Sequence, residues 1–212
     1  MTNYAEKVAQ GLLDIQAVTL NPDQPFTWAS GLHSPIYTDN RLTISYPDVR
    51  ANIYQGMVEL IKANFPEAEV IAGTATAGIP HAAWVAQAMD LPFIYVRSKP
   101  KDHGQGKQVE GVLKPGQKVV VIDDLLSTGG SVLKAAQEVN REGGQVLGVV
   151  AVFSYQLPAL DQNFAEAGLS YQTVTNYTTL ITTAEQKQLI NQDQLASLHQ
   201  WREDPQAWSD QH

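Results

Sequence analysis

The stretch that carries the most chemistry joins two neighbouring carboxylates to a loop of small residues. Asp123 and Asp124 follow a short apolar run at 118–122, which is typical of a strand buried on both faces. The next loop consists of hydroxyl-bearing residues and glycines, namely Ser127, Thr128, Gly129, Gly130 and Ser131. From about Val132 the pattern is helical, and it ends at Gly143-Gly144. The unit is therefore a strand, an acidic pair, a loop and a helix.

Each part of this unit has a physical use. The free N–H groups and the dipole of a helix N-terminus attract a phosphate, glycines let the backbone approach it, and hydroxyls add donors. Two adjacent carboxylates disfavour each other's ionisation unless cations or hydroxyl donors lie nearby, and ribose hydroxyls or a hydrated Mg²⁺ provide that company. The alternative is a strand-to-helix turn without a ligand, but such a turn needs only one capping residue.

A second small-residue loop, at 73–78, reads Gly-Thr-Ala-Thr-Ala-Gly. It follows a short apolar run at 70–72 and precedes a helical pattern from about Pro80. Its inner residues are Thr74, Ala75, Thr76 and Ala77. Successive backbone N–H groups in such a loop can form an anion-binding concavity. A tight turn that simply needs small residues is the alternative, and the sequence leaves both open.

A third segment is strongly basic. Four of the 14 Lys and Arg residues lie between positions 97 and 107, namely Arg97, Lys99, Lys101 and Lys107, with His103 among them. Arg97 follows a predicted strand, and its guanidinium can bind phosphate oxygens through two parallel hydrogen bonds. Gly104 and Gly106 favour a mobile loop, so that Lys101 and His103 could close over a pyrophosphate as a lid. For any single lysine, a solvated surface charge is the alternative.

Bulk properties exclude several classes of protein. The chain has 212 residues, which fits one α/β domain with a small extra element. A net charge of −8 argues against a nucleic-acid binder, and no apolar run is long enough to span a bilayer. There is no cysteine, and the first residues do not resemble a signal peptide. We therefore expect a cytoplasmic enzyme.

The order of the predicted elements positions the three loops. The expected helices cover 3–18, 45–64, 80–89, 132 to the Gly143-Gly144 pair, 158–167 and the chain from 183, and the expected strands cover 70–72, 93–96, 118–122, 145–153 and 171–174. The segment 19–44 is rich in Pro and Gly and favours irregular β structure outside this alternation. The alternation from 45 to 174 predicts a parallel sheet with helices on both faces. Because ligands bind beyond the carboxyl ends of such strands, loops 73–78, 97–108 and 123–131 are expected to meet there.

The acidic pair and its loop resemble the phosphoribosyl-pyrophosphate (PRPP) loop of the type I phosphoribosyltransferases, and the resemblance covers roughly residues 5–180. It implies an α/β fold in which helices flank a central parallel sheet, with a small N-terminal hood. The chain is expected to form one domain over 1–212, with the hood mainly at 19–44, the core at about 45–180 and a C-terminal helical segment at about 181–212. The loop is neither a Walker A loop nor a dinucleotide fingerprint.

Two further segments narrow the resemblance. The run Arg-x-Lys-x-Lys-x-His-Gly from Arg97 is similar to the catalytic loop of the orotate phosphoribosyltransferase family, and residues 26–41 resemble the hood of that family. The resemblance implies transfer of the 5-phosphoribosyl group from PRPP to orotate, which gives orotidine 5′-monophosphate and pyrophosphate. It implies Mg²⁺ as the cofactor. It also implies a homodimer in which the lid loop 98–108 is shared across subunits.

The resemblance also assigns roles to residues. The catalytic residues it implies are Lys101, His103, Asp123 and Asp124. The PRPP-binding residues are Arg97, Lys101, His103, Asp123, Asp124, Leu125, Leu126, Ser127, Thr128, Gly129, Gly130 and Ser131. The pyrophosphate loop is Thr74, Ala75, Thr76 and Ala77. Orotate is expected to contact Ser127, Tyr37 and Arg41. No side chain is assigned as a direct metal ligand, although Asp123 and Asp124 can hold Mg²⁺ through water.

The chain departs from one branch of the family at three positions. That branch has two lysines and an arginine where this chain has Ala29, Ala77 and Tyr155. The carboxylate of orotate must therefore be held in another way, by Arg41 or by backbone N–H groups. For Tyr37 a place in the core is the alternative to stacking on the base, and for Arg41 the alternative is a structural ion pair.

Three other functions compete with this interpretation. A phosphoribosyltransferase for a purine base or for uracil would keep the PRPP loop but not the hood or the basic loop. A PRPP-sensing regulator would keep the fold without catalysis, and such proteins usually add a DNA-binding domain. A generic nucleotide-binding α/β protein is the remaining alternative. The acidic net charge and the direct connection of the first helix to the hood favour the enzyme.

Overall fold

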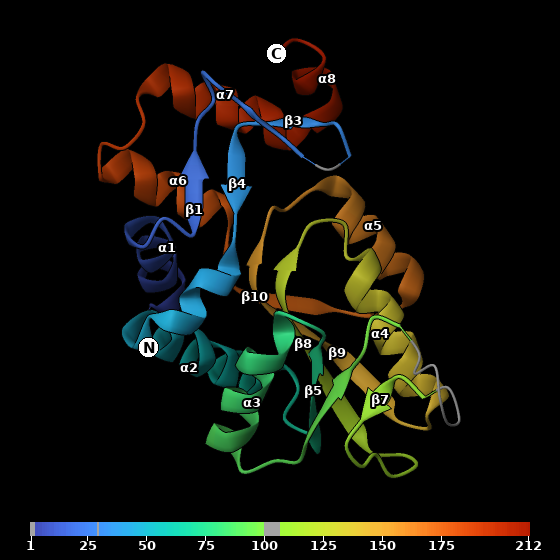
Figure 1. Cartoon of the computed structure of the whole chain (residues 1–212). Helices are drawn as coiled ribbons and strands as arrows, with labels where there is room; N and C mark the ends of the chain where they lie inside the picture. The colour runs from blue at the N-terminus through green and yellow to red at the C-terminus, as the bar shows by residue number, and fades with distance from the viewer. Residues whose placement is uncertain (1–2, 29, 100–106) are drawn as a thin grey trace.

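A central sheet organises the chain (Figure 1). The computed structural model describes residues 3–28, 30–99 and 107–212, and within them the sheet has six strands in the order β10-β9-β8-β5-β6-β7. The strands are β5 (Val70–Thr74), β6 (Phe93–Val96), β7 (Val109–Glu110), β8 (Lys118–Leu126), β9 (Gln145–Ser154) and β10 (Tyr171–Asn176). All neighbours pair in parallel except β6 and β7, which are antiparallel. The predicted parallel sheet is confirmed, with one antiparallel edge strand added.

Strand β8 corrects one prediction. The acidic pair was expected to end the strand at 122, yet β8 continues through both carboxylates to Leu126. Leu125 and Leu126 pair with Phe153 and Ser154 of β9, so the neighbouring strand supplies hydrogen-bonding partners that a local pattern does not show. The acidic pair therefore belongs to a rigid strand, and its backbone position is fixed by the sheet.

Helices cover both faces of the sheet because successive strand residues point to opposite faces. Val120 and Ile122 belong to the core cluster that faces α1 (Tyr4–Asp14), α2 (Pro47–Asn64) and α3 (Gly78–Met89). Val119 and Val121 belong to a second cluster, which faces α4 (Gly130–Arg141) and α5 (Pro158–Ala167). Helix α1 ends earlier than the expected 3–18, because the chain turns at Gln16, where φ is +56°, and enters β1 at Val18.

The hood, which we define as residues 19–44, packs beside the end of the sheet. Strand β1 (Val18–Leu20) pairs antiparallel with β4 (Ile36–Thr38), and β2 (Phe26–Thr27) pairs with β3 (His33–Ser34). A 3-10 helix, η1 (Asn40–Ser45), then leads into α2. These short pairs lie outside the six-stranded sheet, as the Pro and Gly pattern of the segment predicts.

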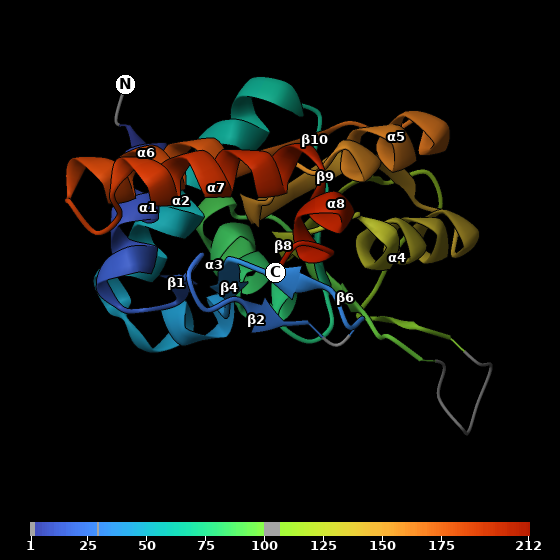
Figure 2. The same cartoon turned by 90° about the horizontal axis from the view of Figure 1, so that it is seen from above.

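The chain ends in three helices, α6 (Tyr177–Gln186), α7 (Gln192–Glu203) and α8 (Pro205–Ser209). Helix α6 starts before the expected position 183, because Asn176 caps it by accepting a hydrogen bond from the Thr179 N–H. Trp201 and Trp208 are 0% and 3% exposed, so the segment is docked. Figures 1 and 2 show α8 beside the hood strands. Within the described ranges, no helix combines the length and apolarity that crossing a bilayer requires.

Candidate active site

Three loops meet at the carboxyl edge of the sheet. Thr74 at the end of β5 pairs with Val96 at the end of β6, and Gly73 pairs with Ile122 of β8. Loops 73–78, 97–108 and 123–131 therefore begin side by side, as the α/β pattern predicts. Beyond the strand ends, these loops and the hood line three neighbouring cavities.

The acidic pair lies near the centre of this edge, with Asp123 buried and Asp124 partly buried. The Thr74 hydroxyl donates to Asp123 Oδ1 over 2.5 Å, and the Asp124 N–H donates to the same oxygen over 2.9 Å. Burial raises the pKa of Asp123. Burial and then the charge of Asp123 raise the pKa of Asp124 to about 7. Such a pair favours a ligand that brings hydroxyl donors or positive charge.

Asn40 joins the hood to this pair, although the sequence patterns described above assign it no role. Its side-chain Nδ2 donates to the backbone oxygen of Asp124 over 2.7 Å. The residue is 1% exposed, and its Oδ1 is buried without a partner within the described residues. The only local signal was its place beside Asp39 and Arg41, which does not reveal a contact with a strand 84 positions away. Asn40 thus fixes the hood relative to β8.

The loop after β8 forms a small cavity of about 130 Å³, lined by Asp123, Leu125 and residues 127–132. Gly129 adopts φ +79°, and a Cβ added there would lie 2.7 Å from the ring of Phe164. The Asn163 side chain donates to the Thr128 backbone oxygen over 2.8 Å, which is a second contact the sequence did not reveal. The loop is therefore held by α5 in a shape that only glycine permits at position 129.

The loop at 73–78 also packs closely against its neighbours, as Gly129 does against α5. A Cβ added at Gly78 would lie 2.5 Å from the Ile122 backbone oxygen, and one at Gly73 would lie 3.0 Å from the Ile79 Cα. The peptide bond between Ala75 and Thr76 is cis. Close packing against β8 is thus one reason for the small residues of this loop. The same loop also lines the largest of the cavities described at this edge. Its role in anion binding stays a prediction.

This largest cavity has a volume of about 620 Å³. Thr74, Ala75, Arg97, Ser131 and Lys134 are among the residues that line it. Lys134 was not predicted, although it lies three residues after Ser131 on α4, a spacing that places two side chains on the same helix face. The cavity therefore presents a guanidinium, an ammonium and loop backbone, which suits a multiply charged anion.

Main-chain and side-chain hydrogen bonds join the two described ends of the basic loop. The Arg97 N–H donates to the Gln108 oxygen over 2.9 Å, and Gln108 Nε2 donates to the Arg97 oxygen over 2.9 Å. Arg97 Nη1 lies 3.7 Å from Glu110 Oε1, and Lys107 pairs with Glu142 over 3.2 Å. The predicted lid residues Lys101 and His103 lie outside the described residues.

A third cavity, of about 300 Å³, lies between the hood and the sheet. Its lining consists of Thr27, Trp28, Tyr37, Thr38, Leu125, Ser127 and Tyr155. Tyr37 is 47% exposed, so the structure excludes the core position that was its alternative. Within the described residues this lining holds no lysine or arginine, and Ala29 is not among those residues. Aromatic rings and hydroxyls form the walls, which suits a flat heterocycle.

Arg41 is held by an ion pair beside this cavity. Its Nε and Nη2 lie 2.6 and 2.8 Å from the two carboxylate oxygens of Asp39. The pair lowers the pKa of Asp39 and raises that of Arg41. The structural ion pair that was the alternative for Arg41 is thus present. Because two-thirds of the arginine side chain remains exposed, its outer face can still meet a ligand.

The raised pKa of Asp124 predicts how pH changes the stability of the free protein. Its pKa is about 7 in the folded state, against 3.8 for an unperturbed carboxyl, so between these values the folded state binds more protons than the unfolded state. The contribution of Asp124 to the free energy of unfolding is therefore expected to fall as pH rises from about 4 to 7. Asp124→Asn removes this dependence and is expected to stabilise the free protein at pH 8 by about 1–3 kcal/mol.

Thermal unfolding of both proteins between pH 4 and 8 measures this effect, because their difference isolates Asp124 from other titrating groups. The difference is expected to grow with pH. A difference that stays constant over this range would show that Asp124 titrates normally in the folded state.

The arrangement defines a class of protein. An acidic pair at the end of a parallel strand, a phosphate-sized loop after it, and a second small-residue loop beside a basic segment are the features of a type I phosphoribosyltransferase. Residues 40–184 match the family model described as a phosphoribosyl transferase domain.

Whole-chain comparisons give a narrower identity. The orotate phosphoribosyltransferase of Lactiplantibacillus plantarum is 61% identical over 208 residues, which cover 98% of either chain. The crystal structure of the Aeropyrum pernix orotate phosphoribosyltransferase is 27% identical with a TM-score of 0.74, over 87% of this chain and 99% of that one. The Mycobacterium tuberculosis orotate phosphoribosyltransferase in complex with PRPP is 26% identical with a TM-score of 0.66, over 84% and 98% of the two chains. The chain belongs to the orotate phosphoribosyltransferase family.

Proposed function

We propose that the three cavities form one site for PRPP and orotate, in which the chain transfers the 5-phosphoribosyl group from PRPP to orotate. One observation carries the proposal. Gly130 and Ser131 line both the 620 Å³ and the 130 Å³ cavities, and Leu125 and Ser127 line both the 130 Å³ and the 300 Å³ cavities. Pyrophosphate leaves from, and the base adds to, the anomeric carbon of one ribose phosphate, and the 130 Å³ cavity likewise adjoins both of the other two cavities.

Each cavity suits one part of the substrates. The 130 Å³ cavity suits the 5′-phosphate, which loop 127–131 would meet with N–H groups and hydroxyls. The 620 Å³ cavity suits the pyrophosphate, near Arg97 and loop 74–77. The 300 Å³ cavity suits orotate, with Tyr37 and Ser127 in its wall and Arg41 close by. Asp123 lines the 130 Å³ cavity, and Asp124 precedes Leu125, which lines both this cavity and the 300 Å³ cavity, so we expect the ribose hydroxyls beside this pair.

The reaction breaks the bond between the anomeric carbon and pyrophosphate, forms a bond from that carbon to N1 of orotate, and releases the N1 proton to solvent or to the leaving pyrophosphate. Positive charge develops on the ribose, as in glycoside cleavage, and negative charge develops on the leaving pyrophosphate. The carboxylates of Asp123 and Asp124 favour the first charge, and Arg97 favours the second. The protein thus acts mainly by positioning and by electrostatic stabilisation.

The acidic pair also fits a hydrated Mg²⁺. Burial raises the pKa of both carboxyls, and a nearby cation would favour their ionised form. Among the described residues there is no group of three or more acidic, His or Cys side chains that could hold a metal ion. Mg²⁺ usually keeps several of its waters, so we expect Asp123 and Asp124 to hold it through water. When bound, the ion neutralises part of the pyrophosphate charge.

The proposal includes a homodimer with a shared lid. The described chain breaks off after Lys99 and resumes at Lys107. Figure 2 shows the segments that follow β6 and precede β7 extending away from the sheet. The resemblance of the basic loop to the catalytic loop of this family supports a lid that reaches a neighbouring subunit and closes over its pyrophosphate cavity. The proposal also treats residues 1–212 as one catalytic unit of hood, core and C-terminal segment, located in the cytoplasm.

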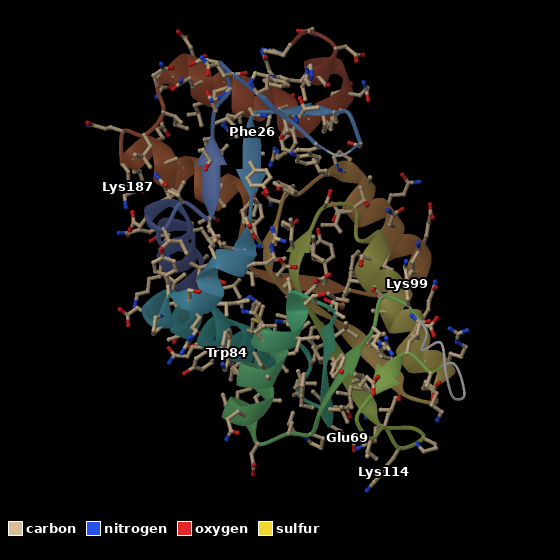
Figure 3. All side chains as sticks on the ribbon, in the orientation of Figure 1. Phe26, Glu69, Trp84, Lys99, Lys114 and Lys187 are labelled. Atoms are coloured by element: carbon tan, nitrogen blue, oxygen red, sulfur yellow. The ribbon has the colours of Figure 1, made fainter. Side chains whose placement is uncertain are left out.

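Lys101→Ala is expected to lower kcat by roughly 10²–10³ without unfolding the protein, because one charged donor to the leaving group is lost. Lys114→Ala is the matched control, since this lysine precedes β8 at the opposite end of the sheet from the site (Figure 3). Steady-state kinetics of both variants give the comparison. A near-normal kcat for Lys101→Ala contradicts the lid assignment.

Mixing two inactive variants tests whether the lid is shared. Lys101→Ala and Asp124→Asn subunits, after exchange in a mixture, are expected to regain activity, because a mixed dimer contains one site with both native residues. If activity does not return although the subunits exchange, the lid serves its own subunit.

A panel of bases tests the proposed substrate. Orotate, uracil and adenine are supplied singly with PRPP and Mg²⁺, and pyrophosphate release and the nucleotide product are measured. Release with orotate, together with orotidine 5′-monophosphate as the product, is expected. Faster release with uracil or adenine would assign the 300 Å³ cavity to another base.

A further inference from the structure

Three aromatic side chains form a triangle behind the base cavity. The ring centroids of Trp28 and Tyr155 are 5.3 Å apart, those of Trp28 and Trp201 are 5.7 Å apart, and those of Tyr155 and Trp201 are 5.9 Å apart. Trp28 comes from the hood, Tyr155 follows the end of β9, and Trp201 comes from α7. Trp28 and Tyr155 line the 300 Å³ cavity, whereas Trp201 does not.

Trp201 therefore supports two cavity walls from behind. Trp201 is fully buried, and its indole N–H has no hydrogen-bond partner within the described residues. The contacts that the structure shows for this side chain are therefore packing contacts. Tilted and edge-on contacts of this kind fix the relative orientation of rings. Because interiors are close-packed, a smaller side chain at this position would leave a void into which Trp28 and Tyr155 could shift.

The C-terminal segment that carries Trp201 is tied to the hood by polar contacts. The His33 N–H donates to Ser209 Oγ over 2.8 Å, and Gln194 Nε2 donates to Asp23 Oδ2 over 2.6 Å. The hood strands and α7 both lie outside the family match at residues 40–184. The two flanking segments thus hold each other, and only Tyr155 of the triangle belongs to the matched region.

We infer that Trp201 is a positioning residue that sets the width of the base cavity through Trp28 and Tyr155, and thereby the affinity for a flat pyrimidine ring. The inference rests on the proposed function. The phosphate-binding edge does not depend on this contact, because loop 127–131 is held by Phe164 and Asn163 of α5. Loss of Trp201 should therefore lower the affinity for the base far more than the affinity for PRPP.

Trp201→Leu is expected to raise KM for orotate about 10-fold or more, while the Kd for PRPP changes less than about 2-fold, since small displacements of substrate-positioning groups have large kinetic effects. Trp208→Leu is the matched control. Trp208 is 3% exposed in the same segment, donates to Ser197 Oγ over 3.0 Å and stacks on His212, and no ring contact joins it to the triangle among the described residues. Trp201→Phe should give an intermediate KM, because a smaller ring restores part of the contact.

Steady-state kinetics give KM, calorimetry gives the PRPP Kd, and thermal unfolding shows that each variant is folded. A rise in the orotate KM that is confined to the Trp201 variants supports the inference. Equal rises for Trp201→Leu and Trp208→Leu, or an equal loss of PRPP affinity, overturn it. If Trp201→Leu does not fold, Trp201→Phe and Trp208→Phe replace the pair, and equal KM values overturn the inference. Failure of the proposed function is distinct, because the wild-type protein would then not consume orotate.

Discussion

Asp124→Asn is expected to lower kcat by roughly 10²–10³ in a protein that remains folded. The substitution keeps the shape of the side chain and removes its charge at the end of β8. The neighbouring residues Asp123 and Leu125 line the cavities that suit the ribose phosphate and the base, so we expect the charge to lie near the sugar that becomes positive. The backbone contact from Asn40 is retained, because it is made to the main-chain oxygen of residue 124.

Stability and activity measurements distinguish an effect of Asp124→Asn on folding from an effect on catalysis. Removing a buried charge relieves repulsion with Asp123, so thermal stability at pH 8 should rise while activity falls. Asp90→Asn is a matched control, because Asp90 is exposed at the C-terminal end of α3 in a left-handed conformation that Asn also tolerates. A kcat within a few-fold of wild type for Asp124→Asn would remove Asp124 from the catalytic machinery.

Gly129→Ala is expected to destabilise the protein by about 2–5 kcal/mol and to abolish measurable PRPP binding. Two effects add at this position. The left-handed backbone, with φ +79°, costs an L-residue about 1–2 kcal/mol. The added methyl group would also crowd the ring of Phe164 and Leu160, and overpacking of this kind costs about 1–3 kcal/mol. The loop can accommodate it only by moving away from α5.

Two other glycines separate these effects. Gly168 has φ +64° but open space around its Cβ position, so Gly168→Ala measures the backbone cost alone. Gly130 adjoins Gly129 in the same loop and has open space without a positive φ, so Gly130→Ala should leave thermal stability unchanged. Denaturant unfolding and PRPP calorimetry compare the three variants. Equal losses of stability for Gly129→Ala and Gly168→Ala would show that α5 does not hold the loop.

The parts of the site that lie within one continuous segment were predictable from the sequence. The apolar run before Asp123 and the small residues after Leu126 specify a strand, a loop and a helix through local conformational preferences. The meeting of loops 73–78 and 123–131 also followed, because parallel strands must end at one edge. The predicted end of β8 was wrong. The last residues of this strand pair with β9, and this pairing holds them in the sheet whatever the polarity of the residues before them.

Contacts between distant segments were not predictable in this way. Asn40 meets β8, Lys134 meets the large cavity, and Trp201 meets the hood, and none of the three stands in a distinctive local pattern. Arg41 shows the same difficulty, because Nε and Nη2 of its guanidinium donate to the neighbouring Asp39. Which polar side chains remain free for a ligand depends on the packed structure.

Orotate absorbance in the presence of PRPP and Mg²⁺, and then with each omitted, measures the central claim most directly. The account predicts a loss of orotate that requires PRPP, with one pyrophosphate released for each orotate consumed, and a slower loss without Mg²⁺. A stable orotate signal, while PRPP still binds in calorimetry, would contradict the account: the phosphate site would stand, and the aromatic cavity would not be a site for orotate.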